Sequence, residues 1–233
     1  ITGSVDMCGR FAQSVPLGIL KKIDIFSDFD QSPHISYNTT PGENADIIIF
    51  REKPEIINSK WGLVSQYGKN GNSPKLIINA RSETAAEKFT FKKLFHHHRC
   101  IIPVSGFYEW EYSDKLKKPF YIYPAGNEAD NTSLLFMAGL YQIAASDRIM
   151  FTVLTRESSE HLKFIHNRMP VCIPPEKLLP WLRPDTPVEE LFNILEKHHI
   201  SEFRFHSKSD TVNNPSNKSE ECIRPAEGQG SFI

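Results

Sequence analysis

The feature that most constrains the fold is a series of short apolar runs rich in β-branched residues. These runs have strand length, are separated by Gly, Pro, Asn and Ser, and cover Ala45–Phe50, Glu55–Ile57, Lys75–Ile78, Ile101–Ser105, Phe107–Trp110, Phe120–Tyr123, Leu134–Tyr141 and Ile149–Thr155. Helical periodicity is rarer and predicts helices over Leu17–Ile25, Ser82–Phe95, Ser158–Ile165, Pro175–Leu182 and Val188–Lys197. Because strands and helices do not alternate, as a parallel sheet requires, the sequence predicts one strand-dominated α+β domain.

Composition narrows the class of protein. The chain has 39% hydrophobic and 24% charged residues, as ordinary globular proteins do, and contains no run of about 18 apolar residues that could span a membrane. The four cysteines (Cys8, Cys100, Cys172 and Cys222) form no C-x-x-C pair, which argues against a zinc site and against a disulfide framework. We therefore expect a monomer without cofactors in a reduced, cytoplasmic setting.

The charge and the histidines also restrict what the chain can bind. A net charge of −1 is not typical of a general nucleic-acid binder, so any DNA binding requires a local groove of arginines. The run His96–His98 and the pair His198–His199 have no carboxylate or cysteine at ligand spacing, which predicts surface histidines and no metal site.

The phrase Met7-Cys8-Gly9-Arg10-Phe11 is the first that indicates chemistry. We expect translation to start at Met7 after a foreign leader, residues 1–6, although a native extension is the alternative. Loss of Met7 would make Cys8 an N-terminal 1,2-aminothiol, with an amine pKa of about 7.7–8.0 and a thiol pKa of about 8.5. Such a group condenses with an aldehyde, first to an imine and then to a thiazolidine. The alternative interpretation of Cys8 is a buried structural cysteine.

Two polar residues next to apolar runs are further candidates. Asn79 follows Ile77-Ile78 and could orient a reacting group, since an amide both donates and accepts; a helix cap is the alternative. Strand alternation places Glu109 on the face opposite Tyr108. There, burial among aromatic side chains would raise its pKa toward neutrality, as acid–base catalysis requires. Because Glu111 shares this face, a solvent-facing Glu109 is the alternative.

His166 is the fourth candidate. It follows the apolar segment Phe164-Ile165 and precedes Arg168 and Pro170. Histidine is the side chain whose unperturbed pKa allows proton exchange near neutral pH, which suits a general acid or base. A packed or surface histidine without a catalytic role is the alternative.

Taken together, these phrases resemble the SOS-response-associated peptidase family, also described as sensors of abasic sites. The motifs that carry the resemblance occur in order over nearly the whole chain, from Met7 to about Pro225. They are MCGRF at Met7–Phe11, YN-x-x-PG at Tyr37–Gly42, WG at Trp61–Gly62, INAR-x-ET at Ile78–Thr84, RC-x-x-P-x-SGFYEW at Arg99–Trp110, a FAGLY-like stretch at Phe136–Tyr141 and IHNRMP at Ile165–Pro170.

The resemblance implies a role for each candidate. Cys8 would attack the ring-opened aldehyde of an abasic site in single-stranded DNA, and Asn79 would orient its amine. Glu109 and His166 would transfer protons. Positions matching Arg10, Arg81 and Arg168 would bind DNA phosphates around the lesion. The implied fold is largely antiparallel, with barrel-like sheets and flanking helices, over a domain of residues 7–227 followed by a loose tail, residues 228–233.

The family resemblance also implies autoproteolysis that exposes the cysteine. With residues 1–7 attached, Cys8 carries an amide instead of an amine and cannot form a thiazolidine. The chain also departs from the family between Trp61 and Lys75, where aromatic wedge residues are common and this sequence has Gln66 and Tyr67.

Two other functions are compatible with the same residues. One is a thiol peptidase that uses Cys8 with His166 as its base. The other is a non-covalent binder of single-stranded DNA, which would stack bases on exposed aromatic side chains. Weak lyase activity by β-elimination is a further expectation of the imine chemistry.

Overall fold

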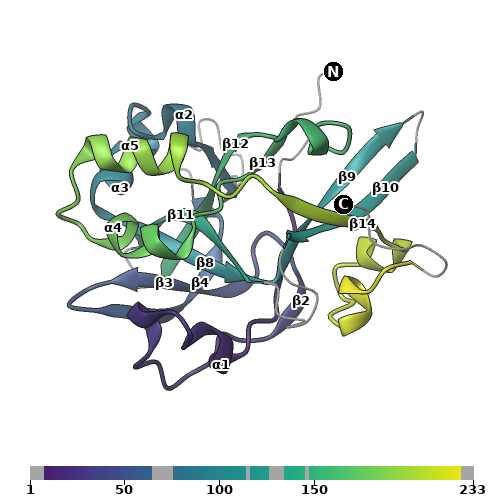
Figure 1. The fold of residues 1–233 in the computed structure, drawn as a ribbon, viewed down its shortest axis with the longest axis horizontal. Helices are drawn as coiled ribbons and strands as arrows, with labels where there is room; N and C mark the ends of the chain where they lie inside the picture. Colours follow the sequence, from purple (N-terminus) through teal and green to yellow (C-terminus); the bar gives the residue numbers. More distant parts are fainter. Residues whose placement is uncertain (1–7, 65–75, 114–115, 126–133, 145–146, 227–233) are drawn as a thin grey trace, which may run out of the picture.

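A computed structural model describes residues 8–64, 76–113, 116–125, 134–144 and 147–226, without the side chains of residues 112, 113 and 116 (Figure 1). Its strands are β1 (Phe11–Gln13), β2 (Ser36–Thr39), β3 (Asn44–Phe50), β4 (Pro54–Trp61), β5 (Leu63–Val64), β6 (Leu76–Ile77), β7 (Asn79–Arg81), β8 (Arg99–Val104), β9 (Gly106–Ser113), β10 (Leu116–Pro124), β11 (Leu135–Ile143), β12 (Ile149–Glu157), β13 (Arg168–Pro170) and β14 (Phe203–Ser207). Its α-helices are α1 (Leu17–Leu20), α2 (Ser82–Ala85), α3 (Phe89–His97), α4 (Leu178–Leu182) and α5 (Val188–Lys197). The short 3-10 helices are η1 (Asp24–Phe26), η3 (Glu160–Leu162), η4 (Pro175–Lys177), η5 (Asp210–Asn213) and η6 (Glu220–Ile223).

The larger sheet closes on itself. Its strand order is β11-β8-β3-β4-β12-β13, and β11 also pairs with β12, so the pairings form a ring. Most pairs are antiparallel, but β12 runs parallel to β4 and to β7. Gly139 on β11 allows this close packing, because a Cβ there would lie 2.7 Å from Cδ1 of Ile102 and 2.9 Å from the carbonyl oxygen of Thr152.

Side-chain alternation along the strands separates two cores. Ile48 belongs to a cluster that includes Phe95, Trp181 and Ile194, so this face of the ring is covered by α3, α4 and α5. Its neighbours Ile47 and Ile49 belong to a second cluster, together with residues of the smaller sheet. Figure 1 shows α2, α3, α4 and α5 gathered at one end of the molecule and strands β9, β10 and β14 of the smaller sheet at the other.

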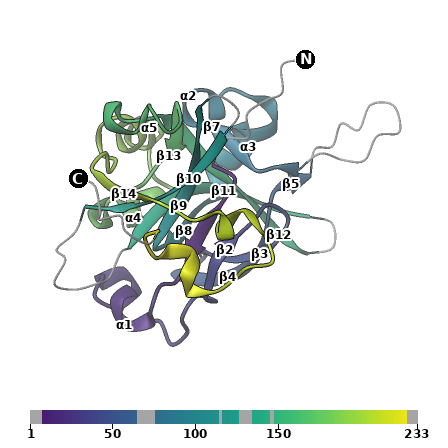
Figure 2. The same cartoon turned by 90° about the vertical axis from the view of Figure 1, so that its right-hand side faces the viewer.

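The smaller sheet has the order β14-β10-β9-β1-β2. One face joins the second core and the other carries a separate cluster of Ala12, Tyr108, Tyr121, Val212 and Cys222. The segment with η5 and η6 lies across this outer face (Figure 2). The chain after Ser207, which is polar in sequence, therefore covers part of a sheet.

The α+β class and the predominance of antiparallel strands are confirmed. The helix Val188–Lys197 is confirmed with its predicted bounds. Among the helices of the described residues, none is long and apolar enough to cross a membrane. The predicted leader 1–6, the tail 228–233 and the positions of Gln66 and Tyr67 lie outside the described residues.

Three predicted helices are wrong in extent. The stretch Ser82–Phe95 forms α2 and α3, because Lys88 takes an extended conformation (φ −64°, ψ 128°) that redirects the chain and lets α3 bury one face. Within Ser158–Ile165 only η3 is helical, since the ends of this segment close a loop in which the Ser158 amide bonds to the Asn167 carbonyl. The stretch Leu17–Ile25 divides into α1 and η1.

Candidate functional site

Cys8 and Glu109 form the centre of the candidate site. The backbone N–H of Cys8 donates to Oε1 of Glu109 over 2.8 Å, and both residues are buried. Pairing of β1 with β9, with Phe11 opposite Phe107, places the two residues together although they are far apart in sequence. Cys8 also has a φ of 36°, in the left-handed region that costs a non-glycine residue about 1–3 kcal/mol. The alternative of a solvent-facing Glu109 is therefore wrong.

Burial changes the acidity of both groups. It raises the pKa of Glu109 to about 8, an effect that the N–H of Cys8 partly offsets. Burial also raises the pKa of the Cys8 thiol, and the neighbouring Glu109 and Cys172 add to the shift. Near neutral pH, therefore, Glu109 can both give and accept a proton, whereas the thiol stays protonated and needs a base to react.

Asn79 approaches the same residue from another element. Its Nδ2 donates to the carbonyl oxygen of Cys8 over 3.3 Å. Strand β7 delivers it there by pairing parallel with β12, with Asn79 opposite Val153. The two predicted partners of Cys8 thus act on opposite sides of it, with Glu109 on its nitrogen and Asn79 on its carbonyl oxygen. Asn79 is a strand residue here and the adjacent helix α2 begins at Ser82, so the helix-cap interpretation of Asn79 is wrong.

His166 lies between η3 and β13 and is 8% exposed. Its Nδ1 is 3.0 Å from the backbone nitrogen of Arg168 and 3.1 Å from the Arg168 carbonyl oxygen, contacts that fix the orientation of the ring. Its neighbour Ile165 packs in the same core cluster as Cys8. Within the residues that the structure describes, the hydrogen bonds of His166 include none to Cys8 or Glu109.

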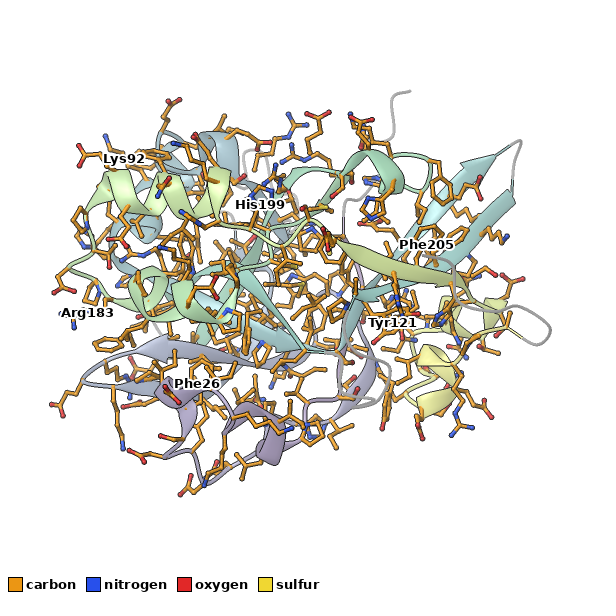
Figure 3. The ribbon with its side chains drawn as sticks, in the orientation of Figure 1. Phe26, Lys92, Tyr121, Arg183, His199 and Phe205 are labelled. Atoms are coloured by element: carbon orange, nitrogen blue, oxygen red, sulfur yellow. The ribbon has the colours of Figure 1, made fainter. Side chains whose placement is uncertain are left out.

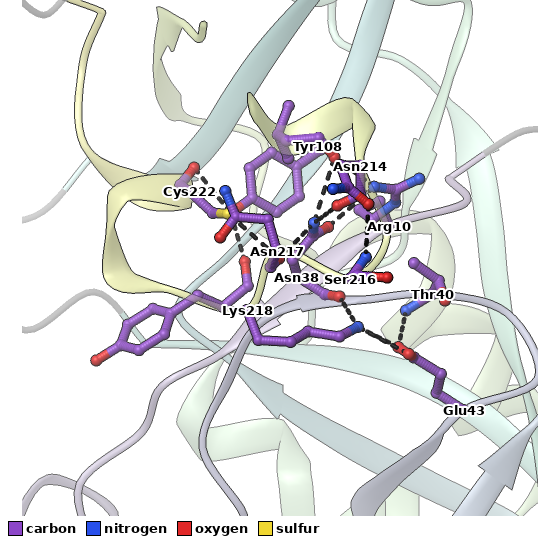
Figure 4. Close-up of polar contacts among 12 residues, drawn as sticks. Arg10, Asn38, Thr40, Glu43, Tyr108, Asn214, Ser216, Asn217, Lys218 and Cys222 are labelled. Atoms are coloured by element: carbon purple, nitrogen blue, oxygen red, sulfur yellow. Dashed lines mark hydrogen bonds and ion pairs between the residues drawn. The ribbon is translucent and has the colours of Figure 1, made fainter. Parts of the chain in front are cut away.

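Arg10 is engaged within the protein. Its Nη1 donates to Oδ1 of Asn38 over 3.0 Å and to the carbonyl oxygen of Val212 over 2.5 Å (Figure 4). Its guanidinium also lies 5.4 Å from the ring centroid of Trp110, and burial lowers its pKa. A phosphate at Arg10 would have to share the guanidinium with these partners.

The other two predicted phosphate ligands differ from each other. Arg168 forms a bidentate pair with Glu83, at 2.5 and 2.9 Å, and bonds to the carbonyl oxygen of Thr155 at 2.7 Å. Arg81 is exposed at the end of β7, two residues after Asn79. Of the three arginines, Arg81 is the one whose exposure suits a phosphate ligand without rearrangement.

Sequence reasoning missed two residues beside Arg10. Asn38 donates from Nδ2 to the carbonyl oxygens of Val212, Asn214 and Asn217, at 3.3, 3.1 and 2.9 Å. Trp110 donates from Nε1 to Oδ1 of Asn213 over 2.8 Å. Both lie in motifs that the sequence displays, but their partners in the C-terminal segment are too distant in sequence to be inferred.

The part of the chain that the structure describes contains no group of three or more His, Cys, Asp or Glu side chains placed to hold a metal ion. His97 and His198 are exposed, and His96, His98 and His199 are half-buried. His98 packs against Tyr141, with ring centroids 5.0 Å apart, because β8 begins directly after it.

Solved structures with this fold include a protein from Bacteroides thetaiotaomicron, with a TM-score of 0.74 at 20% sequence identity, covering 94% of this chain and all of the other. A phage-related protein from Bordetella bronchiseptica has a TM-score of 0.67 at 25% identity, over 86% of this chain and 93% of its own. The chain is also similar in sequence to several proteins that are described as abasic site processing proteins.

The abasic site processing protein YoqW of Bacillus subtilis is 32% identical over 93% of this chain and 99% of its own length. The abasic site processing protein YedK of Escherichia coli is 31% identical over 94% of this chain and its entire own length. HMCES of Mus musculus, described in the same words, is 28% identical over 95% of this chain and 76% of its own. The model of the SOS response associated peptidase (SRAP) family matches residues 7–215, and the chain belongs to this family.

Proposed function

We propose that this protein processes abasic sites in DNA and that, once Cys8 is its N-terminal residue, it captures them covalently as a thiazolidine. The observation that carries the proposal is the 2.8 Å contact between the Cys8 nitrogen and buried Glu109. After removal of the preceding residues this nitrogen becomes the α-amine. The group that reacts with an aldehyde is then already beside an acid–base residue. The abasic-site processing named for relatives such as YoqW and YedK supports the substrate class.

The reaction requires two bond-forming steps. The Cys8 amine adds to the aldehyde carbon of the ring-opened sugar, and the resulting hydroxyl leaves as water to give an imine. The protonated form of Glu109, whose pKa is about 8 in the chain that still carries Met7, supplies the proton to that hydroxyl. The thiol then adds to the imine carbon, and its proton passes to the nitrogen as the five-membered ring closes.

Each neighbouring residue has a part in this scheme. Asn79 holds the Cys8 carbonyl at 3.3 Å and so fixes the direction of the amine. His166 exchanges protons with the sugar during ring opening. Arg81, exposed beside Asn79, binds a phosphate of the single strand, while Arg168 and Arg10 contribute after exchanging internal partners. An imine that loses the 3′ phosphate by β-elimination would give the protein weak lyase activity.

The same contacts support autoproteolytic exposure of Cys8. The thiol attacks the Met7 carbonyl, the peptide nitrogen leaves as the Cys8 amine, and water hydrolyses the thioester. Protonated Glu109 lies 2.8 Å from the departing nitrogen, gives it the required proton and in turn accepts the proton of the attacking thiol. The left-handed conformation of Cys8 (φ 36°) adds strain at this junction, which cleavage would release.

The test compares protein that begins at Cys8 with the full chain and with a Cys8-first Cys8→Ser variant. Each is mixed with single-stranded DNA that carries one abasic site and is run on a denaturing gel. We expect a heat-stable adduct from the Cys8-first protein, and none from the serine variant, whose hydroxyl cannot form a thiazolidine. The full chain should form the adduct only after it has lost residues 1–7, a loss that mass spectrometry detects.

Two outcomes would redirect the proposal. Adduct formation by the Cys8→Ser variant would exclude the thiazolidine. If the Cys8-first protein bound the DNA without any adduct, the function would be non-covalent binding of single strands. A Cys8–His166 peptidase acting on other proteins is less well supported, because the described contacts of His166 go to Arg168.

A further inference from the structure

Three aromatic side chains from different elements form a cluster, which we call the aromatic platform: Phe120 on β10, Phe164 after η3 and Phe205 on β14. Their ring centroids are 5.8 Å (Phe120–Phe164), 5.9 Å (Phe120–Phe205) and 5.4 Å (Phe164–Phe205) apart. Phe164 packs edge-to-face on Phe120, with an interplanar angle of 86°. Phe120 is 4% exposed and Phe205 is half-buried, but Phe164 is 51% exposed, so two more covered rings hold an open one in place.

The platform lies beside the candidate site. Phe120 is directly opposite Glu109 in the β9–β10 ladder, and directly opposed residues project from the same face, with Cβ atoms about 5 Å apart. Phe205 is opposite Ile122, which is itself opposite Phe107, so it shares that face. Figure 3 shows Phe205 on β14 beside the β9–β10 hairpin. Phe164 precedes His166 by two residues.

We propose that the aromatic platform, through Phe164, stacks on a base of single-stranded DNA next to the lesion. This rests on the proposed function, which brings a single strand to Cys8 and Glu109. Every base offers a flat ring, so stacking on an aromatic side chain is independent of sequence, as a lesion sensor needs. Because Phe120 and Phe205 already hold Phe164, little side-chain freedom is lost on binding.

The charges around the platform favour stacking over phosphate binding. The ammonium of Lys118 lies 5.2 Å from the Phe120 ring centroid, but Lys118 is opposite Glu111 in the ladder. Lys163, next to Phe164, is paired with Glu157 and Glu160 at 3.1 and 2.6 Å. Both lysines therefore lie beside residues of opposite charge, which leaves the exposed ring as the main feature that DNA would contact. Removing the Phe164 ring should therefore weaken binding equally at all salt concentrations.

The competing interpretation is that Phe164 only packs the loop between β12 and β13. Substitutions of Phe164 by side chains of different shape distinguish base stacking from loop packing. Phe164→Leu keeps an apolar side chain for packing but removes the ring, whereas Phe164→Trp keeps a ring for stacking. Phe89→Ala is the matched control, because Phe89 is 82% exposed but lies at the start of α3 on the helical side of the molecule.

The first measurement is the affinity of the Cys8-first protein for undamaged single-stranded DNA, by fluorescence anisotropy over a range of salt. We expect Phe164→Ala and Phe164→Leu to weaken binding by about tenfold, while Phe164→Trp and Phe89→Ala leave it unchanged. The slope of log affinity against log salt should be the same for all variants, since no phosphate contact is lost. Wild-type affinity in Phe164→Leu would overturn the proposal.

The second measurement locates the stacked base. 2-Aminopurine is placed on either side of a tetrahydrofuran abasic analogue, which cannot form an adduct. We expect quenching of its fluorescence on one side, which Phe164→Ala abolishes; no Phe164-dependent quenching on either side would overturn the proposal. Failure of the proposed function is distinguishable, because it would abolish the adduct with a true abasic site and leave this quenching intact.

Discussion

Tyr108 and Glu109 are neighbours on β9 that face opposite sides of one sheet, and both are buried. On the outer face, the Tyr108 hydroxyl lies 2.6 Å from the Tyr37 carbonyl oxygen and 3.0 Å from that of Cys222, and burial raises its pKa far above neutrality. On the inner face, burial raises the pKa of Glu109 to about 8. Burial therefore keeps the Tyr108 hydroxyl protonated, as a hydrogen-bond donor to carbonyl oxygens, and brings the pKa of Glu109 into the range where the carboxyl exchanges protons near neutral pH.

The two faces also differ in what covers them. The outer face is closed by the chain's own C-terminal segment, held by Asn38, Arg10 and Lys218, whose Nζ reaches Glu43 at 2.6 Å. The inner face holds Glu109 against the backbone nitrogen of Cys8, a group that the proposed cleavage before Cys8 would change from an amide to an amine. Similar burial thus holds a structural hydrogen bond on one face and, in the proposed function, an acid–base group on the other.

The largest expected effect tests the inner face of the sheet, which carries Glu109. Glu109→Gln in Cys8-first protein keeps the side-chain shape but cannot exchange a proton, so adduct formation should slow by about 10²- to 10⁴-fold. Rates of adduct formation on abasic single-stranded DNA across pH 6–9 measure this. A rate close to wild type would show that Glu109 is only structural, and Glu111→Gln provides a control on the same strand.

The second effect concerns stability and pH in the full chain. The folded state holds the Glu109 proton up to a pH of about 8, whereas an unfolded glutamate releases it near 4.5. The stabilisation is therefore full below pH 4.5 and is lost as the pH rises to about 8, by at most about 5 kcal/mol for the 4.5-to-8 shift. Urea unfolding of wild type and Glu109→Gln from pH 5 to 9 measures it. Equal pH slopes in the two proteins would contradict it.

A smaller effect tests the outer face of the sheet, which the C-terminal segment covers. Asn38→Ala removes the donor to the Val212, Asn214 and Asn217 carbonyls, and should lower the free energy of unfolding by about 2–3 kcal/mol. The loss should be independent of pH between 5 and 9, in contrast to that at Glu109. Urea unfolding measures the change, and limited proteolysis should cut the C-terminal segment first. Protection equal to wild type would show that other contacts hold the segment.

The smallest effect is expected for Tyr108→Phe. This change removes only the hydroxyl and leaves the carbonyls of Tyr37 and Cys222 with one partner fewer, which should cost about 1–2 kcal/mol of unfolding free energy. Adduct formation should stay at the wild-type rate, because the hydroxyl lies on the outer face. A loss of adduct comparable to that of Glu109→Gln would break the distinction between the two faces.

The agreement between sequence and structure is best where local pattern is sufficient. The helix Val188–Lys197 and the strands around Ala45–Phe50 and Leu134–Tyr141 follow from periodicity and turn residues. The strands Phe11–Gln13 and Phe203–Ser207 were not predicted, because both are short and their pairing with β9 and β10 joins distant parts of the chain. The division of Ser82–Phe95 depends on burying α3, which local propensity does not contain.

The sequence by itself determined the family and the α+β class, since ordered motifs and strand alternation are local properties, and it predicts Cys8, Asn79, Glu109 and His166 as the candidate site. Only the tertiary structure decided that Glu109 is buried against the Cys8 nitrogen, that Asn79 bonds to the Cys8 carbonyl, and that Arg10 is engaged by the C-terminal segment. The reason is physical. Burial, pKa and hydrogen-bond partners depend on which distant strands pair, and β1 meets β9 across about 95 residues of chain.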